Sequence, residues 1–498
     1  MSPIYILLIA TAYFGMLFFI SFRTGKDNSN EAFFRGKKES PWYLVAFGMI
    51  GASLSGITFI SVPGAVGAAN FSYMQMVFGY LLGYFLIATV LLPLYYSLNL
   101  ISIYSYLEKR FGFWGYKTGS GFFLLSRVIG ASLRLYLVAA VLQTFVFSAW
   151  GLPFWFTVSA TILLIWLYTF RGGIKTVVWT DSLQTFFMLL SLFLGVYYIS
   201  SELNFGFGTM VETVQNSQYS KMLNWDFSGA LFSKSFPMQF LNGASIALVM
   251  TGLDQDMMQK NLTCKNIGDA KKNMLWFSLI LVVVNFIFLI LGALLYIYAD
   301  SKGIGIPTET INGIVKNRPD LLFPEIALNH LNPIMASIFV IGLLAAAYSS
   351  ADSALTSLTT SFCVDFLDFE KGKSPKNTRY LVHIGFSVLL FFVILIFRWI
   401  NDDSVIWWVF KAAGYTYGPL LGLFAFGLLS RRKVNDSFLV LLICVICPII
   451  CYFLNIYSTK IFFGYQLGFE LLLINGLLTY LGLFLLSSKA DYEFEDQN

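Results

Sequence analysis

The sequence predicts an all-α membrane protein with thirteen transmembrane helices, and three observations support this fold class. Of the 498 residues, 57% are hydrophobic and only 12% are charged, which is about half the charge of an average soluble domain. The apolar residues form runs of about 20, the length that an α-helix needs to cross a bilayer. Most of the 32 Lys and Arg residues fall in alternate connections between these runs, as they do in cytoplasmic loops.

Each transmembrane helix is predicted from an apolar run between two polar breaks. The thirteen ranges are 4–22, 43–66, 74–97, 118–148, 153–170, 180–201, 236–255, 273–298, 333–362, 379–399, 405–429, 436–455 and 465–487. The longest connections, 202–235 and 299–332, are too short for a separate domain, and little chain follows the last helix. We therefore expect residues 1–498 to form a single integral-membrane domain without a catalytic or signalling module.

The distribution of basic residues predicts the orientation of the helices. Met1-Ser2-Pro3 contains no basic residue before the first apolar run, whereas Arg23 and Lys26 follow it. This charge order is the reverse of that in a signal peptide, so we expect the first run to remain as a membrane helix. Because cytoplasmic loops keep the excess of Lys and Arg, the N-terminus is predicted outside and the C-terminus in the cytoplasm, in the cell inner (plasma) membrane.

The composition argues against several functional classes. The net charge of +5 is spread over short loops, so it does not indicate nucleic-acid binding. With two histidines in the chain and no recognisable pair of nucleophile and base, metal cluster or phosphate loop, we do not expect an enzyme. Five cysteines show no pairing pattern and are interpreted as small packing residues: Cys264, Cys363, Cys444, Cys447 and Cys451.

The second predicted helix is interrupted by small and polar residues. The stretch 51–64 contains three glycines, three serines and Pro63. Pro63 lacks a backbone donor, and the glycines and serines loosen the helix around it, which frees carbonyl groups that can coordinate a cation. The alternative is a packing seam, because small residues also let helices approach closely.

The ninth predicted helix has a face rich in serine. At about 100° per residue, Ala346, Ser349, Ser350 and Ser353 share one side of the helix. Their hydroxyl groups and a backbone carbonyl are hard oxygen ligands of the kind that suits an alkali cation. The alternative is that these serines bond back to carbonyls of their own helix.

Two carboxylates are predicted at membrane depth, where charge is costly and usually functional. Asp181 lies at the start of the sixth predicted helix, and Asp352 lies within the serine-rich face of the ninth. Asp181 has an alternative role as a helix-start residue that the helix dipole favours. No such alternative accounts for Asp352.

Three cations are also predicted within the membrane. Arg127 and Arg134 are seven residues apart on one face of the fourth helix, and Lys411 lies near the outer end of the eleventh. Because guanidinium groups prefer carboxylate or phosphate partners, these side chains are candidates for binding an anionic substrate. The alternative is structural pairing, for which Asp254 and Asp256 at the inner end of the seventh helix are available; these two could instead form an inner gate.

Together these segments resemble the sodium/solute symporter family, which includes carriers of proline, sugars, iodide, vitamins and sialic acids. The resemblance rests on the thirteen spans, on the segment from Gly172-Gly173 to Thr180-Asp181, and on the Ala-rich run that leads to Ser349-Ser350. It implies a core of two inverted five-helix repeats of the amino-acid/sodium symporter type, at approximately 43–201 and 236–429. One extra helix precedes this core and two follow it.

The resemblance also implies where cations bind. A sodium ion would lie between the second and ninth helices, held by Gly51, Leu54, Ala346, Ser349 and Ser350. A second cation site, of the kind found in bacterial sialic acid carriers, would use Asp181, Asp352 and Ser353. Because Asp352 stands where those carriers have a serine, three interpretations stay open: a tighter sodium site, a proton-coupled carboxylate, or no site.

For the solute, the stretch 54–59 resembles the carboxylate-binding segment of the sialic acid carriers. The substrate residues that follow from this resemblance and from the buried cations are Ser55, Thr58, Tyr73, Gln75, Arg127 and Arg134. The carriers' own substrate arginine aligns with Gly130, one turn from each of the two arginines. We expect an organic anion such as an acidic, sialic acid-like sugar or a monocarboxylate, with a neutral sugar as the alternative.

The function expected from these features is sodium-coupled import of a small organic solute by alternating access. Sodium would be the coupling ion, and the partners would be the solute, sodium and the lipid bilayer, with the chain acting as a monomer. A channel or receptor that keeps the scaffold without coupled transport is the other class considered.

Overall fold

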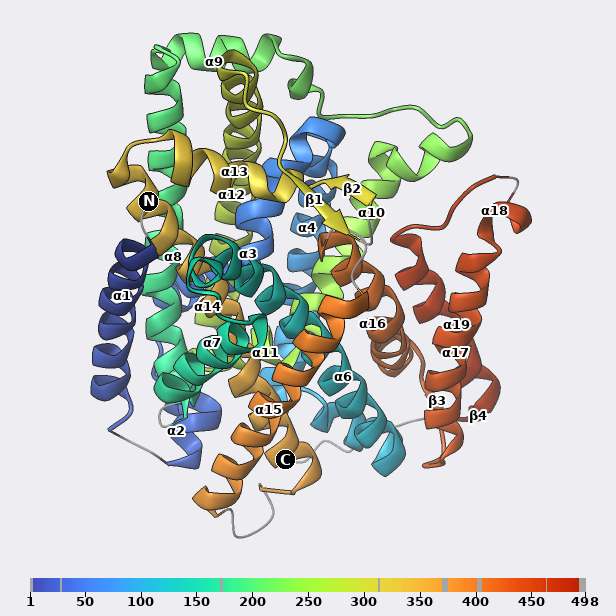
Figure 1. Cartoon of the computed structure of the whole chain (residues 1–498). Helices are drawn as coiled ribbons and strands as arrows, with labels where there is room; N and C mark the ends of the chain where they lie inside the picture. Colours follow the sequence, from blue (N-terminus) through green and yellow to red (C-terminus); the bar gives the residue numbers. More distant parts are fainter. Residues whose placement is uncertain are drawn as a thin grey trace.

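The computed structural model describes residues 3–26, 29–170, 173–311, 314–369, 375–400, 405–462 and 464–491, and each predicted span coincides with a helix or a pair of helices (Figure 1). These are α1 (Pro3–Thr24), α3 (Trp42–Ala69), α4 and α5 (Tyr73–Leu86 and Leu92–Ser97), α6 (Ser105–Phe145), α7 (Phe154–Thr169), α8 (Gly173–Glu202), α10 and α11 (Phe236–Ala247 and Gln255–Asn261), α12 (Ile267–Lys302), α14 (Pro333–Ser361), α15 (Lys376–Ile400), α16 (Val405–Leu429), α17 (Leu439–Ile456) and α19 (Glu470–Leu486).

Short elements connect the long helices. The short helices are α2 (Asn30–Arg35), α9 (Phe207–Asn216), α13 (Leu322–Glu325) and α18 (Ser458–Ile461). The antiparallel strand pairs are β1 with β2 (Thr308–Ile311 and Ile314–Asn317) and β3 with β4 (Arg432–Lys433 and Ser488–Asp491). Turns of π-helix cover Ile87–Leu91, Leu248–Gly252, Ile326–His330 and Phe362–Phe366, and 3-10 turns cover Gly36–Lys38, Phe147–Trp150, Gln218–Ser220, Gly229–Lys234 and Pro319–Leu321.

Fewer than the thirteen predicted spans meet the length and apolarity expected of a membrane-crossing helix. Ten helices in the described part of the chain are long and apolar enough, and α10 with α11 would make eleven if that pair, bent by 69°, is one span. The remaining two predicted spans, at 153–170 and 465–487, correspond to α7 and α19, which are apolar but only 16 and 17 residues long. A bilayer crossing needs about 17 to 25 apolar residues.

Several helices begin earlier than the apolar runs indicated. α6 begins at Ser105 instead of 118, α8 at Gly173 instead of 180, and α12 at Ile267 instead of 273. The added turns contain polar residues, which a search for apolar runs excludes although their backbone is helical. Gly172, which is part of the segment that resembles the symporter family, lies outside the described residues.

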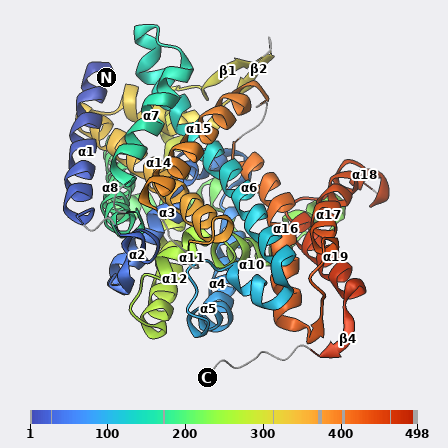
Figure 2. The same cartoon turned by 90° about the horizontal axis from the view of Figure 1, so that it is seen from below.

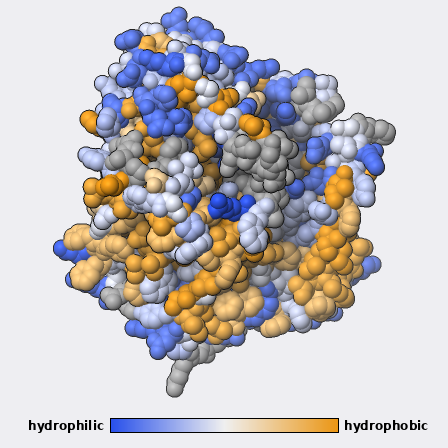
Figure 3. Space-filling view, viewed as in Figure 1, coloured by the Kyte–Doolittle hydropathy of each residue, from blue (hydrophilic) through white to orange (hydrophobic). Residues whose placement is uncertain are grey.

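The helices pack as a bundle with α1 at one end and α17 and α19 at the other (Figures 1 and 2). Helices α3, α8 and α14 pack against one another, and α12 packs on α3, α4 on α10, and α16 on both α6 and α19. In Figure 3 apolar side chains gather across the lower half of the face shown, with hydrophilic side chains above them and at the lower edge. This distribution fits a protein whose flank contacts lipid.

Candidate functional site

Helix α3 is broken in its middle, as the sequence predicted for this segment. Ser55 has φ 43° and ψ 170° and interrupts the helical backbone. A residue other than glycine rarely adopts a positive φ, and the strain costs about 1–3 kcal/mol. The break lies at Ser55, eight residues before Pro63. It is surrounded by buried residues, so any backbone carbonyl freed here faces other helices instead of lipid.

The serine pair of α14 lies against the carbonyl groups just before this break. The Ser349 hydroxyl is 3.2 Å from the Gly51 carbonyl oxygen and 3.4 Å from the Ala346 carbonyl oxygen. The Ser350 hydroxyl is 3.2 Å from the carbonyl oxygen of Ala52, a residue that the sequence did not single out. These separations exceed the 2.5–3.0 Å of ordinary O–H···O hydrogen bonds, so the oxygens cluster without binding one another tightly.

Leu54 belongs to the same stretch, but no hydrogen bond in the described residues joins its carbonyl to Ser349 or Ser350. It is the last residue before the break at Ser55. The structure thus brings Gly51, Ala346, Ser349 and Ser350 together and leaves Leu54 next to them.

Gly51 is a glycine because α8 packs directly on α3 at this point. A Cβ atom at position 51 would overlap the side chain of Thr185. The Gly51 amide donates a hydrogen bond to the Thr185 hydroxyl (3.0 Å), which in turn donates to the Asp181 carbonyl (2.8 Å). This close approach fixes the position of the Gly51 carbonyl opposite α14.

A pocket lies beside the break in α3 and encloses about 100 Å³. Ala52 and Leu54 line it, so the pocket adjoins the cluster of oxygens on α3 and α14. Five of the six predicted substrate residues also line it: Ser55, Thr58, Tyr73, Arg127 and Arg134. We therefore take this pocket as the candidate solute site.

The sixth predicted substrate residue, Gln75, does not line the pocket. Its side chain is buried and hydrogen-bonds instead to the Lys234 carbonyl (3.3 Å) and the Asn224 amide (2.9 Å). The physical reason is helix geometry, because residues two apart on a helix point in nearly opposite directions. Since Tyr73 faces the pocket, Gln75 on the same helix faces the loop that contains Asn224.

The structure distinguishes the two arginines of α6. Arg127 is buried, forms a close ion pair with Asp256 and lies 3.8 Å from a carboxylate oxygen of Asp254. Arg134 lines the same pocket, and no hydrogen bond or ion pair joins it to any described residue. Lys411, predicted as a third buried cation, is exposed. Arg134 is therefore the strongest candidate among these three cations for an anionic ligand.

Helix α11 and its N-cap carry three buried charged side chains, Asp254, Asp256 and Lys260. It follows the 69° bend after α10, and the Asp254 side chain caps it by accepting a hydrogen bond from the Asp256 amide (2.9 Å). The Tyr417 hydroxyl donates to Asp254, and the Ser353 hydroxyl donates to Asp256. These contacts tie α11 to α14 and α16, while Arg127 ties it to α6.

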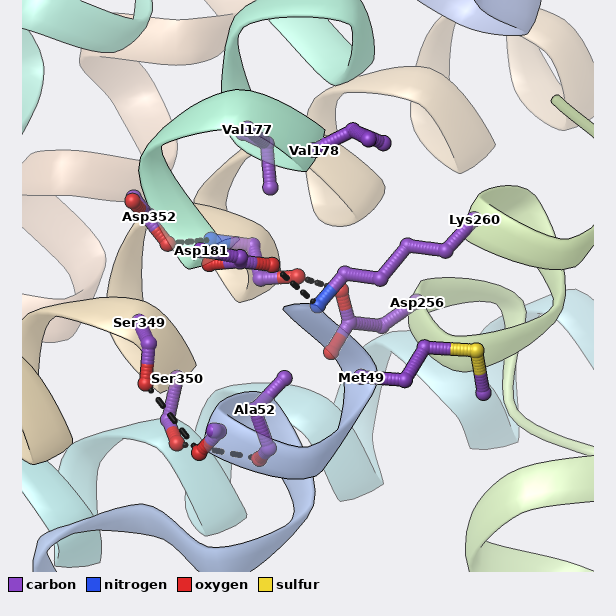
Figure 4. Close-up of polar contacts among 12 residues, drawn as sticks. Met49, Ala52, Val177, Val178, Asp181, Asp256, Lys260, Ser349, Ser350 and Asp352 are labelled. Atoms are coloured by element: carbon purple, nitrogen blue, oxygen red, sulfur yellow. Dashed lines mark hydrogen bonds and ion pairs between the residues drawn. The ribbon is translucent and has the colours of Figure 1, made fainter. Parts of the chain in front are cut away.

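Lys260, also on α11, forms an ion pair that the sequence did not predict. Its ammonium nitrogen lies 2.8 Å from a carboxylate oxygen of Asp181, and both side chains are fully enclosed. Figure 4 shows Lys260 reaching across from α11 to Asp181 on α8, past Asp256. The sequence assigned Lys260 to a cytoplasmic loop because the predicted span ended at 255.

The three residues expected at a second cation site have separate partners. Asp181 is paired with Lys260, and Ser353 donates its hydroxyl to Asp256. The Asp352 carboxylate accepts hydrogen bonds from Tyr168 (2.9 Å) and, at a longer 3.5 Å, Thr180, and also from the amide of Ser353 (2.6 Å). The arrangement is a network of fixed charges and hydrogen bonds.

Other pocket residues were missed by the sequence reasoning. Tyr80 and Tyr84 line the pocket with Tyr73, and the hydroxyls of Tyr73 and Tyr80 are 3.1 Å apart. Their spacings of seven and four residues place all three on one helix face, a signal that could have found them. Thr251 and Asn285 also line the pocket, and the side-chain amide oxygen (Oδ1) of Asn285 is buried with no hydrogen-bond partner among the described residues.

Comparison with known proteins adds a family and relatives. The model of the sodium:solute symporter family matches residues 33–443. The sodium/sialic acid symporter NanT of Aliivibrio fischeri is 24% identical over 94% of this chain and 91% of its own length. The sodium-coupled monocarboxylate transporter 1 of Xenopus laevis is 25% identical over 85% of this chain and 67% of its own.

A solved structure has the same fold. A Na⁺-coupled sialic acid symporter in a substrate-bound outward-open state aligns with a TM-score of 0.81 over 97% of this chain and 99% of that one. The sequence identity in this alignment is 19%, so the likeness concerns the fold alone.

Proposed function

The chain belongs to the sodium:solute symporter family, and from that premise we propose that it imports a small organic anion whose carboxylate binds Arg134. Membership of this family confirms the predicted class, a multi-pass membrane transporter with sodium as the coupling ion. The solute, the binding residues and the topology are proposals. The single observation that carries the choice of solute is Arg134, a guanidinium group that lines the pocket and has no hydrogen-bond or ion-pair partner among the described residues.

An unpaired guanidinium at membrane depth is costly, and such groups normally face a partner or a water-filled cavity. A carboxylate is the partner that matches the guanidinium geometry best, because it accepts two parallel hydrogen bonds. Arg127 is a weaker candidate for binding the solute, because its guanidinium group is already paired with Asp256 and Asp254. Both relatives described above are named as carriers of acids, which supports the same class of solute.

The rest of the pocket favours an acid that also carries hydroxyl groups. Tyr73, Tyr80, Ser55 and Thr58 line the wall together with Arg134, and each can donate to or accept from a sugar hydroxyl. We therefore favour an acidic sugar over a short monocarboxylate. A neutral sugar is the second candidate, since it would use the same hydroxyl groups without Arg134.

We place the coupling sodium ion between α3 and α14. The proposed ligands are the predicted set of Gly51, Leu54, Ala346, Ser349 and Ser350, with the Ala52 carbonyl added. The support is the loose cluster of carbonyl and hydroxyl oxygens, which are hard ligands at separations too long for strong hydrogen bonds. Because Ala52 and Leu54 also line the pocket, sodium bound here would order the wall that the solute touches.

Transport then follows by alternating access. Sodium entering from outside stabilises the outward-open state, solute binds beside the break in α3, and the core closes and reopens inward. Sodium leaves into a cytoplasm where it is scarce, and a membrane potential of 100 mV supplies about 2.3 kcal/mol per charge.

The proposed topology retains thirteen spans, with α7 and α19 as short crossings. It retains the inverted repeats at approximately 43–201 and 236–429, a single membrane domain, and a functional monomer. The N-terminus is placed outside and the C-terminus in the cytoplasm, which follows from the loop charges.

The test is thermal unfolding of the purified protein against an acidic sugar, a short monocarboxylate and a neutral hexose, each in sodium and in potassium. A ligand present at about 100 times its dissociation constant adds about 2.7 kcal/mol of stability. We expect the acidic sugar to stabilise the protein in sodium only, and the Arg134→Met variant to lose this response. Stabilisation by the hexose but by neither acid would overturn the anion proposal.

A further inference from the structure

Lys260 lies against Asp181, the carboxylate that the sequence predicted as part of a second cation site. The ammonium group is 2.8 Å from Asp181, only 1% of the lysine residue is exposed, and Asp181 is fully buried. A lysine side chain is almost never buried to this degree unless it is paired. The contact therefore places an ammonium group, covalently attached to the chain, against Asp181.

The neighbouring carboxylates have their own partners. Asp256 is held by Arg127 and the Ser353 hydroxyl, and Asp254 by Arg127 and the Tyr417 hydroxyl. Sodium at Asp181 would have to displace a tethered ammonium group from its ion-pair partner in the protein interior. Removing one member of a buried ion pair in this way is strongly unfavourable.

We propose that the ammonium group of Lys260 takes the place of a second sodium ion at Asp181, so that the chain moves one sodium ion with each solute. This inference rests on the proposed sodium site between α3 and α14, which supplies that single ion. A tethered cation that stays at the carboxylate throughout the cycle would contribute nothing to coupling, because it does not cross the membrane.

Asp352 completes the arrangement without providing a second site. Its carboxylate is oriented by Tyr168 and Thr180 and by the backbone of Ser353. Ser353, the remaining hydroxyl of the expected site, is directed to Asp256. A second sodium ion would therefore find Asp181 neutralised and Ser353 engaged.

The first experiment counts sodium without any solute. Equilibrium binding of radioactive sodium to the purified wild-type chain is expected to saturate at one ion per protein. Saturation at two ions would overturn the proposal. Because no solute is needed, a wrong solute assignment cannot affect this result, whereas loss of sodium binding in Ser349→Ala tests the first site separately.

The second experiment removes the tethered charge. Lys260→Met leaves Asp181 open, and we expect binding to rise to two sodium ions per protein; a folded variant that still binds one ion would overturn the role of Lys260. The charge-neutral pair Lys260→Met with Asp181→Asn removes both partners and is expected to bind one ion. Lys260→Arg, which keeps the positive charge, is also expected to bind one, and two ions there would contradict the proposal.

Discussion

Two clusters on successive turns of α14, called the neutral face and the charged face, differ in whether they contain charged side chains. Ser349 and Ser350 meet carbonyl oxygens of α3, and no charged side chain takes part in those contacts. Asp352 and Ser353 face α8 and α11, where Asp181 and Asp256 are matched by Lys260 and Arg127. The neutral face offers hydroxyl and carbonyl oxygens to the proposed sodium ion, whereas the carboxylates of the charged face are already paired with Lys260 and Arg127.

This difference favours the neutral face as the proposed sodium site. Hydroxyl and carbonyl groups can bond weakly to one another when no ion is bound, so sodium can enter and leave at modest cost. Buried full charges cannot separate in this way, because each ion left alone pays a large desolvation penalty. A transport site therefore fits the neutral face, and a structural junction fits the charged one.

The largest expected effect tests the charged face. Arg127→Met leaves Asp254 and Asp256 without their cation, and breaking a buried pair in this way costs about 3–5 kcal/mol. We expect a marked fall in the thermal unfolding temperature of the purified protein, measured without solute. An unchanged unfolding temperature would show that Arg127 does not hold α11 in place.

Arg134→Met is the matched control, because Arg134 lies seven residues away on the same helix face. No described residue pairs with it, so its removal leaves no carboxylate uncompensated. We expect little change in stability without solute and loss of stabilisation by an acidic solute. If the two variants destabilised the protein equally, the distinction between a paired and an unpaired arginine would be wrong.

The sequence predicted the neutral face better than the charged one, for a physical reason. Small residues and a helix break leave a local signature, so Gly51, Ser349 and Ser350 could be recognised from the chain alone, and the structure brings them together. The Lys260–Asp181 pair spans 79 positions (260 − 181) and joins two helices, so its formation depends on the 69° bend before α11. Apolar runs do not encode that bend.

Apolar runs and family resemblance also could not predict which way Gln75 points or how many helices are long enough to cross the membrane. Gln75 was predicted together with Tyr73 from the family resemblance, although the helical period places the two residues on opposite faces of α4. α7 and α19 were predicted as spans from their apolarity, and their lengths of 16 and 17 residues fall at the lower limit for a crossing. The family and the coupling ion, in contrast, were recognised correctly from the sequence.

The second prediction concerns the neutral face. Ser349→Ala removes a hydroxyl ligand, and a hydrogen-bond-type contact to a charged group is worth about 1.5–3 kcal/mol. We expect the affinity for sodium, measured by radioactive sodium binding, to fall by roughly 10- to 100-fold. Ser357→Ala is the control, because Ser357 is equally buried on α14 and donates to the Ala354 carbonyl of its own helix; its loss should leave sodium affinity unchanged.

A third variant tests the packing that holds the neutral face in position. Gly51→Ala places a methyl group against Thr185, and overpacking of this kind costs about 1–3 kcal/mol. We expect lower stability and weaker sodium binding together, because α3 must move away from α8. Adding Thr185→Ala frees the space and should restore part of both; failure of the double variant to recover either property would rule out the steric explanation.

The smallest expected effect separates the two sides of α4. Gln75→Met keeps the side-chain size and removes the hydrogen bonds to Lys234 and Asn224, which should cost about 1 kcal/mol of stability. Because Gln75 faces the loop, the dissociation constant of the solute should stay the same.

Tyr73→Phe is expected to have the opposite effect. It removes a hydroxyl that lines the pocket and contacts Tyr80, so solute binding should weaken while stability changes little. A solute dissociation constant that rises in Gln75→Met and not in Tyr73→Phe would mean that the opposite face of α4 forms the pocket wall.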